Sequence, residues 1–194
     1  MSTLTAEEIT NFWIRVYFGT TNREELISEV INRAYRDWNR TAHGLGKIEK
    51  TAGMNAIKDY MKVVVQEITT NTYNKEEFDN WHKNKCITLI NLFVEQIRFR
   101  ISFGQAQKWI NMTLKYLFAL GEVKIHGINK NYQHFHIPID SIIQNKFKAL
   151  NIRPLKNRWS RIENYDTYIQ YQNKVRERFS NEIPCDIEFR LFNE

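Results

Sequence analysis

A lysine and an aspartate lie where two helices are expected to begin, and together they could do chemistry on a sugar. Lys108 follows Gly104 by four residues in the opening turn of one predicted helix, and Asp140 follows Pro138-Ile139 at the start of a later one. The positive end of a helix dipole favours a neutral amine, which is the nucleophilic form. A nearby carboxylate could accept the proton and stabilise positive charge on a sugar ring. The pair therefore predicts cleavage of an N-glycosidic bond through a Schiff base.

Each of these residues also has an ordinary structural interpretation. A lysine on a helix is most often a solvated charge, and an aspartate that follows Pro-Ile is most often a plain N-cap. The two together, in a segment with almost no other acidic residue, favour the catalytic hypothesis more than either does alone.

Positive charge is concentrated in one part of the chain. The net charge is +6, whereas residues 98–161 alone carry twelve Lys or Arg and two acidic residues, a net charge of +10. Such a segment suits the phosphate backbone of DNA, although a solvated basic face with no partner remains the alternative. The residues expected to contact double-stranded DNA are Arg98, Arg100, Arg153, Lys156, Arg158 and Arg161.

Length and composition predict one mainly helical domain over residues 1–194. The 194 residues are 42% hydrophobic and include only 7 Gly and 3 Pro, which is enough for a core but offers few turn-formers for an all-β fold. No apolar run reaches membrane-spanning length and the first residues lack a signal-peptide pattern, so we expect a soluble, cytoplasmic protein. Cys86 and Cys185 are expected to be buried free thiols.

Four helix starts follow from residues that cap a helix and are followed three positions later by Glu or Gln. These pairs are Thr5 and Glu8, Asn22 and Glu25, Asn74 and Glu77, and Ser102 and Gln105. Apolar residues at helical spacing predict a further helix over roughly 49–70, one after Asp140, and a last long one from about Tyr165. We expect Gly121 to end the helix that bears Lys108.

Two segments alternate in polarity instead of following a helical period. Residues 123–137 predict a short hairpin or a long ordered loop, and residues 186–191 predict a terminal strand or an extended tail. The first segment contains His126, His134 and His136, but no carboxylate or thiol accompanies them within it. We therefore expect no metal site and no cofactor.

The motifs around Lys108 and Asp140 resemble those of the helix-hairpin-helix DNA glycosylases, in particular the oxoguanine glycosylase branch. In that branch a Gly-x-x-x-Lys helix start is followed by a Pro-Val-Asp helix start, which correspond here to Gly104…Lys108 and Pro138-Ile139-Asp140. The resemblance covers about residues 98–175. It implies Lys108 as nucleophile, Asp140 as general base or electrostatic stabiliser, Met112 and Gln170 as base-binding residues, and an enzyme that flips a base out of duplex DNA. We expect a monomer, although the sequence leaves the oligomeric state open.

The sequence departs from the family pattern in two places. The glycine-rich hairpin is reduced to Gly104, so Arg98 or Arg100 is expected to replace its grip on phosphate. Residues 121–137 form an apparent insertion that could remodel the pocket, so an oxidised purine and a bulkier phage-type modified base both remain open as substrates, as does strand scission (AP lyase activity). The alternatives to a glycosylase are a non-catalytic nucleic-acid-binding helical protein and a component of a bacterial phage-defence system.

Overall fold

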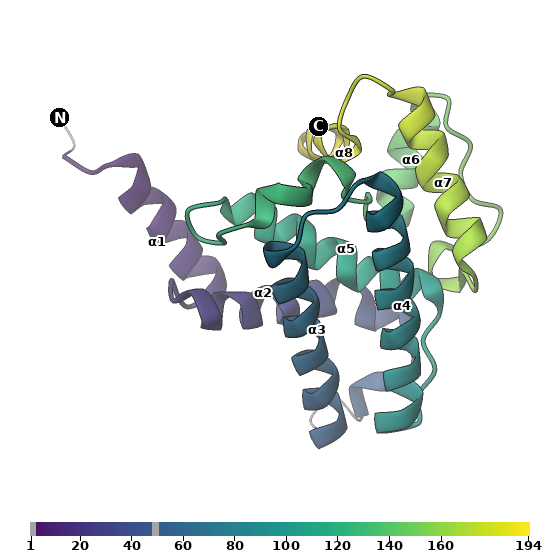
Figure 1. Ribbon diagram of the computed structural model, residues 1–194, viewed down its shortest axis with the longest axis horizontal. Helices are drawn as coiled ribbons and strands as arrows, with labels where there is room; N and C mark the ends of the chain where they lie inside the picture. Colours follow the sequence, from purple (N-terminus) through teal and green to yellow (C-terminus); the bar gives the residue numbers. More distant parts are fainter. Residues whose placement is uncertain (1–2, 48–50) are drawn as a thin grey trace.

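The computed structural model describes residues 3–47 and 51–194, and within those ranges it contains helices and no strand (Figure 1). This confirms the prediction of a helical domain. The α-helices are α1 (Ala6–Phe18), α2 (Arg23–Trp38), α3 (Ala52–Thr70), α4 (Lys75–Ile97), α5 (Phe103–Leu120), α6 (Ser141–Ala149), α7 (Tyr165–Arg178) and α8 (Pro184–Asn193). Short 3-10 segments are η1 (Asn39–Thr41), η2 (Leu45–Lys47), η3 (Ile128–His134) and η4 (Trp159–Arg161). No helix in this part of the chain is long and apolar enough to cross a membrane.

The predicted helix starts are confirmed, and each has its capping bond. Thr5, Asn74 and Ser102 form complete capping boxes, in which the cap side chain and the side chain three residues later each satisfy a backbone amide. Asn22 caps α2 by accepting from the amides of Glu24 and Glu25. These bonds span only two or three residues, so they form wherever the local sequence supplies them.

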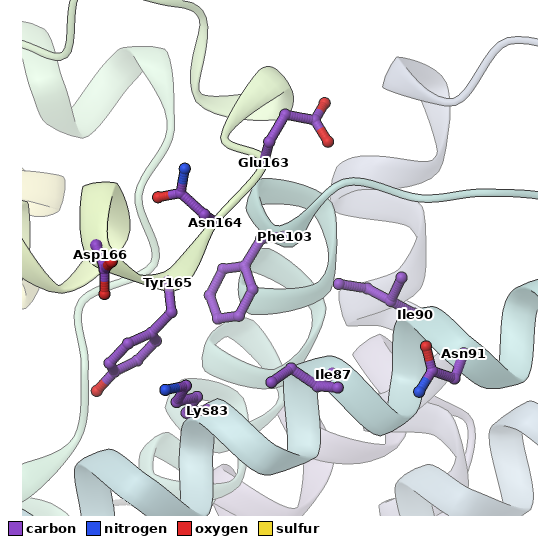
Figure 2. A pocket seen from close by; sticks show the side chains of 9 residues that line it. All are labelled: Lys83, Ile87, Ile90, Asn91, Phe103, Glu163, Asn164, Tyr165 and Asp166. Atoms are coloured by element: carbon purple, nitrogen blue, oxygen red, sulfur yellow. The ribbon is translucent and has the colours of Figure 1, made fainter.

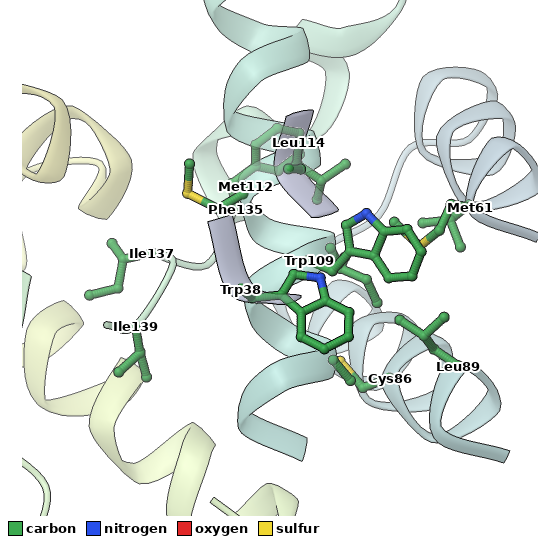
Figure 3. Close-up of a cluster of buried hydrophobic side chains, with 14 of the residues drawn as sticks. Trp38, Met61, Cys86, Leu89, Trp109, Met112, Leu114, Phe135, Ile137 and Ile139 are labelled. Carbon is green, nitrogen blue, oxygen red and sulfur yellow. The ribbon is translucent and has the colours of Figure 1, made fainter. Parts of the chain in front are cut away.

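The fold is built around α5. Every residue from Phe103 to Lys115 is buried, and α2 and α4 pack against this helix. Trp38 of α2 and Trp109 of α5 lie close together in the core, with ring centroids 5.7 Å apart (Figure 3). The Trp109 indole also donates a 3.0 Å hydrogen bond to the Ile31 carbonyl, so this large side chain is fully buried with its polar atom satisfied.

Of the two alternatives predicted for residues 123–137, the hairpin is wrong and the ordered loop is closer to the structure, because this segment packs against α3 and α4 instead of pairing with itself. The Asn131 side chain donates to the carbonyls of Ile68 and Asn71 and accepts from the Tyr73 amide. Gly127 has a φ of 89° and approaches Thr69 so closely that a Cβ there would lie 2.1 Å from its carbonyl oxygen. These contacts wind residues 128–134 into η3 and leave 135–140 extended.

The strand or extended tail predicted for residues 186–191 is also wrong, since residues 184–193 form α8. Pro184 occupies the first helical turn, where its missing amide costs nothing. Pro184, Ile187, Glu188 and Leu191 are buried and recur at the three- and four-residue spacing of one helix face. Residues 186–191 also alternate in polarity, so their pattern fits either a strand or one face of a helix. Packing against the rest of the fold decides between the two.

Candidate functional site

Side-chain amides form hydrogen bonds with the backbone of the extended segment 135–140. In a sheet, a neighbouring strand would form these bonds. Gln172 of α7 accepts from the Ile137 amide at 3.2 Å and donates to its carbonyl at 2.8 Å. Gln107 of α5 donates to the Ile139 carbonyl at 3.1 Å, and Asn111 donates to that of Ile137 at 3.2 Å. All three amides are buried, so the backbone is satisfied in the interior and its register against α5 is set.

This register brings Asp140 to Lys108. The ammonium Nζ lies 2.6 Å from Asp140 Oδ2, while Oδ1 accepts from the Ile143 amide at 2.8 Å and caps α6. The side chains are 5% and 22% exposed, respectively. Lys108 is the sixth residue of α5, so its expected place in the opening turn is wrong. Helix-dipole effects fade within one turn, so the Asp140 carboxylate is the group that acts on the amine.

The pair opens into a cavity of about 260 Å³ between α2, α5, α6 and α8. The structure places Met112, predicted to bind a base, in the same lining. Five basic and three acidic side chains line the cavity, which favours an anionic ligand. The full lining is Arg33, Asp37, Arg40, Lys108, Met112, Lys115, Tyr116, Asp140, Ile142, Ile143, Lys146, Glu188, Leu191 and Phe192.

A second ion pair lies in the same cavity, two turns further along α5. Lys115 Nζ is 2.5 Å from Glu188 Oε2, with side chains that are 8% and 5% exposed. The Lys115 ammonium also lies 4.7 Å from the ring centroids of Phe189 and Phe192. Burial raises the pKa of the Glu188 carboxyl, although the charge of Lys115 opposes that shift. Both amines are therefore nearly closed off from solvent, and the carboxylate beside Lys115 is the more buried of the two carboxylates.

Two segments that carry arginines, η1 and η4, bond to the residues at the start of α5. Ser102 Oγ donates to the Ser160 carbonyl at 2.8 Å, and the Gln105 side chain donates to Thr41 Oγ1 at 3.1 Å. Ser160 lies within η4 and Thr41 ends η1. The exposed arginines on or beside these segments are Arg40, Arg98, Arg100, Arg158 and Arg161, and we call them the arginine cluster.

The start of α5 is itself covered by η4. The Gly104 amide donates to the Ile162 carbonyl at 3.0 Å, and a Cβ on Gly104 would lie 1.8 Å from the Trp159 carbonyl oxygen. The Gly104 and Gln105 amides are thus bonded within the chain. The family resemblance implies that backbone amides bind phosphate here, but the Gly104 amide has no hydrogen left to donate to a phosphate. The arginine cluster supplies the positive charge at this end.

The remaining predicted residues lie apart from the cavity. Arg153 and Lys156 are exposed and line a separate cavity of about 610 Å³ with Lys174 of α7. Gln170 is exposed on α7 and is not among the residues that line the Lys108 cavity, so the structure does not bring it to the other predicted base-binding residue. Two positions further on, Gln172 is the amide that faces the interior.

A buried polar network behind segment 135–140 was not anticipated. His136 lies 2.6 Å from Asp79 Oδ1 through Nε2 and 2.7 Å from the Tyr168 hydroxyl through Nδ1. Asn111 donates to that hydroxyl at 2.9 Å and its Oδ1 lies 2.8 Å from His82 Nε2. Burial lowers the pKa of His136 to about 4, although its hydrogen bond to Asp79 opposes that shift. The described residues hold no group of three or more His, Cys, Asp or Glu side chains arranged for a metal ion.

Another cavity, of about 390 Å³, lies between α4 and the start of α7 (Figure 2). One basic side chain, Lys83, faces the acidic Glu163 and Asp166 in its lining, together with the apolar Ile87 and Phe103. It contains none of the residues predicted for catalysis or base binding. The Lys108 cavity is therefore the candidate functional site.

Comparisons with protein-family models, with curated proteins and with solved structures gave no match. The site is therefore interpreted from its own residues. The positioning amides Gln107 and Asn111 were missed, although a signal was present. They are polar residues four positions apart on a helix whose other buried residues include Ala106, Ile110 and Leu114.

Proposed function

We propose that this protein is a DNA glycosylase that flips a damaged or modified base out of DNA and excises it at the Lys108 cavity. The observation that carries the proposal is the 2.6 Å contact between Lys108 Nζ and Asp140 Oδ2 at a cavity that Met112 also lines. A nucleophile and the group that accepts its proton must lie within this distance of each other. The resemblance around Gly104 and Pro138 supports the same roles.

The proposed reaction begins when Lys108 passes a proton to Asp140 and becomes a neutral amine. The amine attacks the anomeric carbon of the deoxyribose, so that a C–N bond to the lysine forms while the N-glycosidic bond breaks. The base leaves with the bonding electron pair and takes up the proton that Asp140 holds. The ammonium formed on Lys108 then passes one proton to the ring oxygen as the bond between that oxygen and the anomeric carbon breaks, which leaves a protonated imine. Water hydrolyses the imine, releases the lysine as its ammonium and leaves an abasic site.

Charge and size support DNA as the substrate. The arginine cluster lies at the end of α5 nearer Lys108, and its member Arg40 also lines the cavity. Clustered arginines suit several phosphates of one strand. A cavity of about 260 Å³ is smaller than most drug-sized pockets, which suits a single flipped base better than a large cofactor.

A second candidate function, nucleic-acid binding without catalysis, is favoured by the burial of the same pair. Lys108 is 4% exposed and Asp140 already caps α6, so both side chains have complete structural roles. Removing one partner of a buried ion pair destabilises a protein whether or not the pair reacts. The two candidate functions therefore both predict DNA binding, and only the glycosylase forms a covalent intermediate with DNA.

Trapping of the imine tests the proposal. Duplexes that carry oxidised purines or bulkier modified bases are incubated with the protein and borohydride, and parallel samples without borohydride are treated with alkali to reveal abasic sites. We expect a covalent adduct with one class of base, and Lys108→Gln should abolish it. Lys115→Gln is the matched control, since it removes another buried, paired lysine of α5 and should keep the adduct. An adduct that survives Lys108→Gln would reject Lys108 as the nucleophile, and no excision of any base would favour the binding protein.

Asp140→Asn tests the carboxylate separately from its structural role. Asparagine is also a good N-cap, so the variant should keep its fold and its DNA affinity. Loss of the proton acceptor should slow excision about a thousandfold, or about 4 kcal/mol in barrier height. Single-turnover excision rates and circular dichroism measure the two effects, and an unchanged rate would rule out this site. The class of base excised would also distinguish a role in DNA repair from one in phage defence.

A further inference from the structure

Helix α1 carries a stripe of apolar side chains that are largely exposed to solvent. The side chains of Ile9, Phe12, Trp13, Val16 and Tyr17 are 47–62% exposed. They recur at spacings of three and four residues and therefore share one face of the helix. We call them the α1 stripe.

The opposite face of α1 is the one that packs on the protein. Ile14 is buried and Phe18 packs against the core, while the N-terminal end of α1 projects away from the other helices (Figure 1). Arg33 of α2 lies 4.9 Å from the Tyr17 ring centroid, at the C-terminal end of the stripe. One helix thus carries two apolar faces, and its own domain uses only one of them.

The exposed area is large enough for self-association. Half-exposed side chains of these sizes present about 500 Å² of apolar surface on each copy. A single large patch on a monomer typically covers about 300–600 Å² and often marks an interaction site. Two copies packed through the stripe would bury about 1,000 Å², which is the lower limit for a specific interface between proteins.

The charges beside the stripe favour an antiparallel arrangement of two copies. Glu8 and Arg15 are seven residues apart, so both lie along the same flank of the helix, one near each end. When two identical helices pack antiparallel, Glu8 of each faces the Arg15 end of the other, and the two contacts form together. A membrane surface suits this helix less well, because Glu7 and Glu8 outnumber Arg15, whereas surface-binding helices are rich in Lys and Arg.

We infer that the α1 stripe is a homodimer interface, in which α1 of one copy packs antiparallel against α1 of a second copy. A homodimer would replace the monomer that we expected from the sequence. The inference is independent of the proposed chemistry, because none of the stripe residues lines the Lys108 cavity.

Sedimentation equilibrium of the full chain at micromolar concentrations tests this inference. We expect twice the chain mass of 23.4 kDa for the wild type and a single chain mass for Trp13→Glu, with unchanged helix content by circular dichroism. Val94→Glu is the control, since Val94 is an exposed apolar residue of α4 outside the stripe and its change should leave the dimer intact. A wild type of single mass, or a Trp13→Glu variant that keeps the double mass, would overturn the inference, and so would a monomer that sediments with anionic lipid vesicles.

Charge exchange tests the antiparallel geometry. Arg15→Glu places acidic residues opposite one another and should raise the dissociation constant of the dimer at least tenfold. Adding Glu8→Arg to this variant restores opposite charges across the interface and should recover most of the affinity. Glu8 also completes the capping box of α1, so Glu8→Arg alone is the matched control for loss of that bond. A double variant no tighter than Glu8→Arg alone would reject the antiparallel arrangement.

Discussion

At the scale of single residues, the two buried lysines of α5 show how environment separates similar groups. Lys108 and Lys115 each contact a carboxylate within 2.6 Å and line one cavity. Asp140, the partner of Lys108, is 22% exposed, whereas Glu188, the partner of Lys115, is 5% exposed and lies beside two phenylalanine rings. The two amines are about equally buried, but a carboxylate that exchanges protons needs access, so the greater exposure of Asp140 supports Lys108 as the amine proposed to react.

Protonation of buried histidines predicts how stability depends on pH. Burial lowers the pKa of His136 from 6.5 to about 4, and burial also lowers that of His82. Below about pH 6.5 the unfolded chain therefore binds protons that the folded protein excludes. We expect the free energy of unfolding to be greatest above about pH 6.5 and to fall as the pH falls toward about 4, measured by urea denaturation.

Substitution of His136 tests this assignment. His136→Asn should flatten the profile, because it removes one of the groups whose protonation state differs between folded and unfolded chains. A profile of the same slope in His136→Asn would contradict the assignment of the effect to His136.

At the scale of secondary-structure elements, α5 positions the site through its first residues and its buried polar side chains. Its first residues bind η1 and η4, its buried amides Gln107 and Asn111 set the register of segment 135–140, and Lys108 meets the aspartate that ends this segment. Leu114 and Leu117 of the same helix are buried in the core. The catalytic hypothesis therefore depends on the packing of one helix.

Gly104→Ala tests the close approach of η4 to α5. A methyl group on Gly104 would lie 1.8 Å from the Trp159 carbonyl oxygen, so η4 has to move. Although alanine favours the helix, overpacking against backbone should lower the free energy of unfolding by about 1–3 kcal/mol or more. Gly46→Ala is the control, because a Cβ there meets no atom within 4 Å and the residue has no positive φ. Equal stabilities of the two variants would show that η4 does not rest on Gly104.

At the scale of the whole molecule, the charge of +6 is unevenly placed, and the arginine cluster is one place where it gathers. Its members come from segments that are about 60 residues apart in sequence or more, and the first turn of α5 joins them. A concentrated positive surface near the cavity would steer a DNA strand to the site and hold it by its phosphates.

Salt dependence measures how many phosphates the protein contacts. Affinity for duplex DNA should fall steeply with salt, with a log–log slope that grows by about 0.9 for each contact. Reversing Arg158 and Arg161 to glutamate should weaken binding and make the slope shallower by about two contacts. Reversing Arg23 and Lys62, which are exposed but belong to α2 and α3, should leave the slope unchanged, and fluorescence anisotropy at several salt concentrations gives both results. A DNA affinity that does not change with salt concentration would contradict the proposed contacts with DNA phosphates.

The sequence by itself determined the helical class and the helix starts, because those depend on contacts between near neighbours. Ser102 and Gln105 satisfy one another's amides within a single turn, and Asp140 caps α6 through an amide three residues away. Such bonds form independently of the rest of the fold, so the residue types that make them can be recognised in the sequence. The Lys108 and Asp140 pair was predicted as well, through the spacing and the family resemblance.

Only the tertiary structure decided the conformation of residues 123–140 and 184–193 and the composition of the site. Segment 135–140 is extended because Gln107 and Gln172 bond to its backbone from helices about 30 residues away on either side, and α8 is a helix because its buried face packs inside the fold. Gln170 and Gln172 look alike in sequence, yet one faces solvent and the other the interior. Alternating polarity fits a strand, a loop or one helix face, and the free energy that selects among them comes from burial against partners that are distant in sequence.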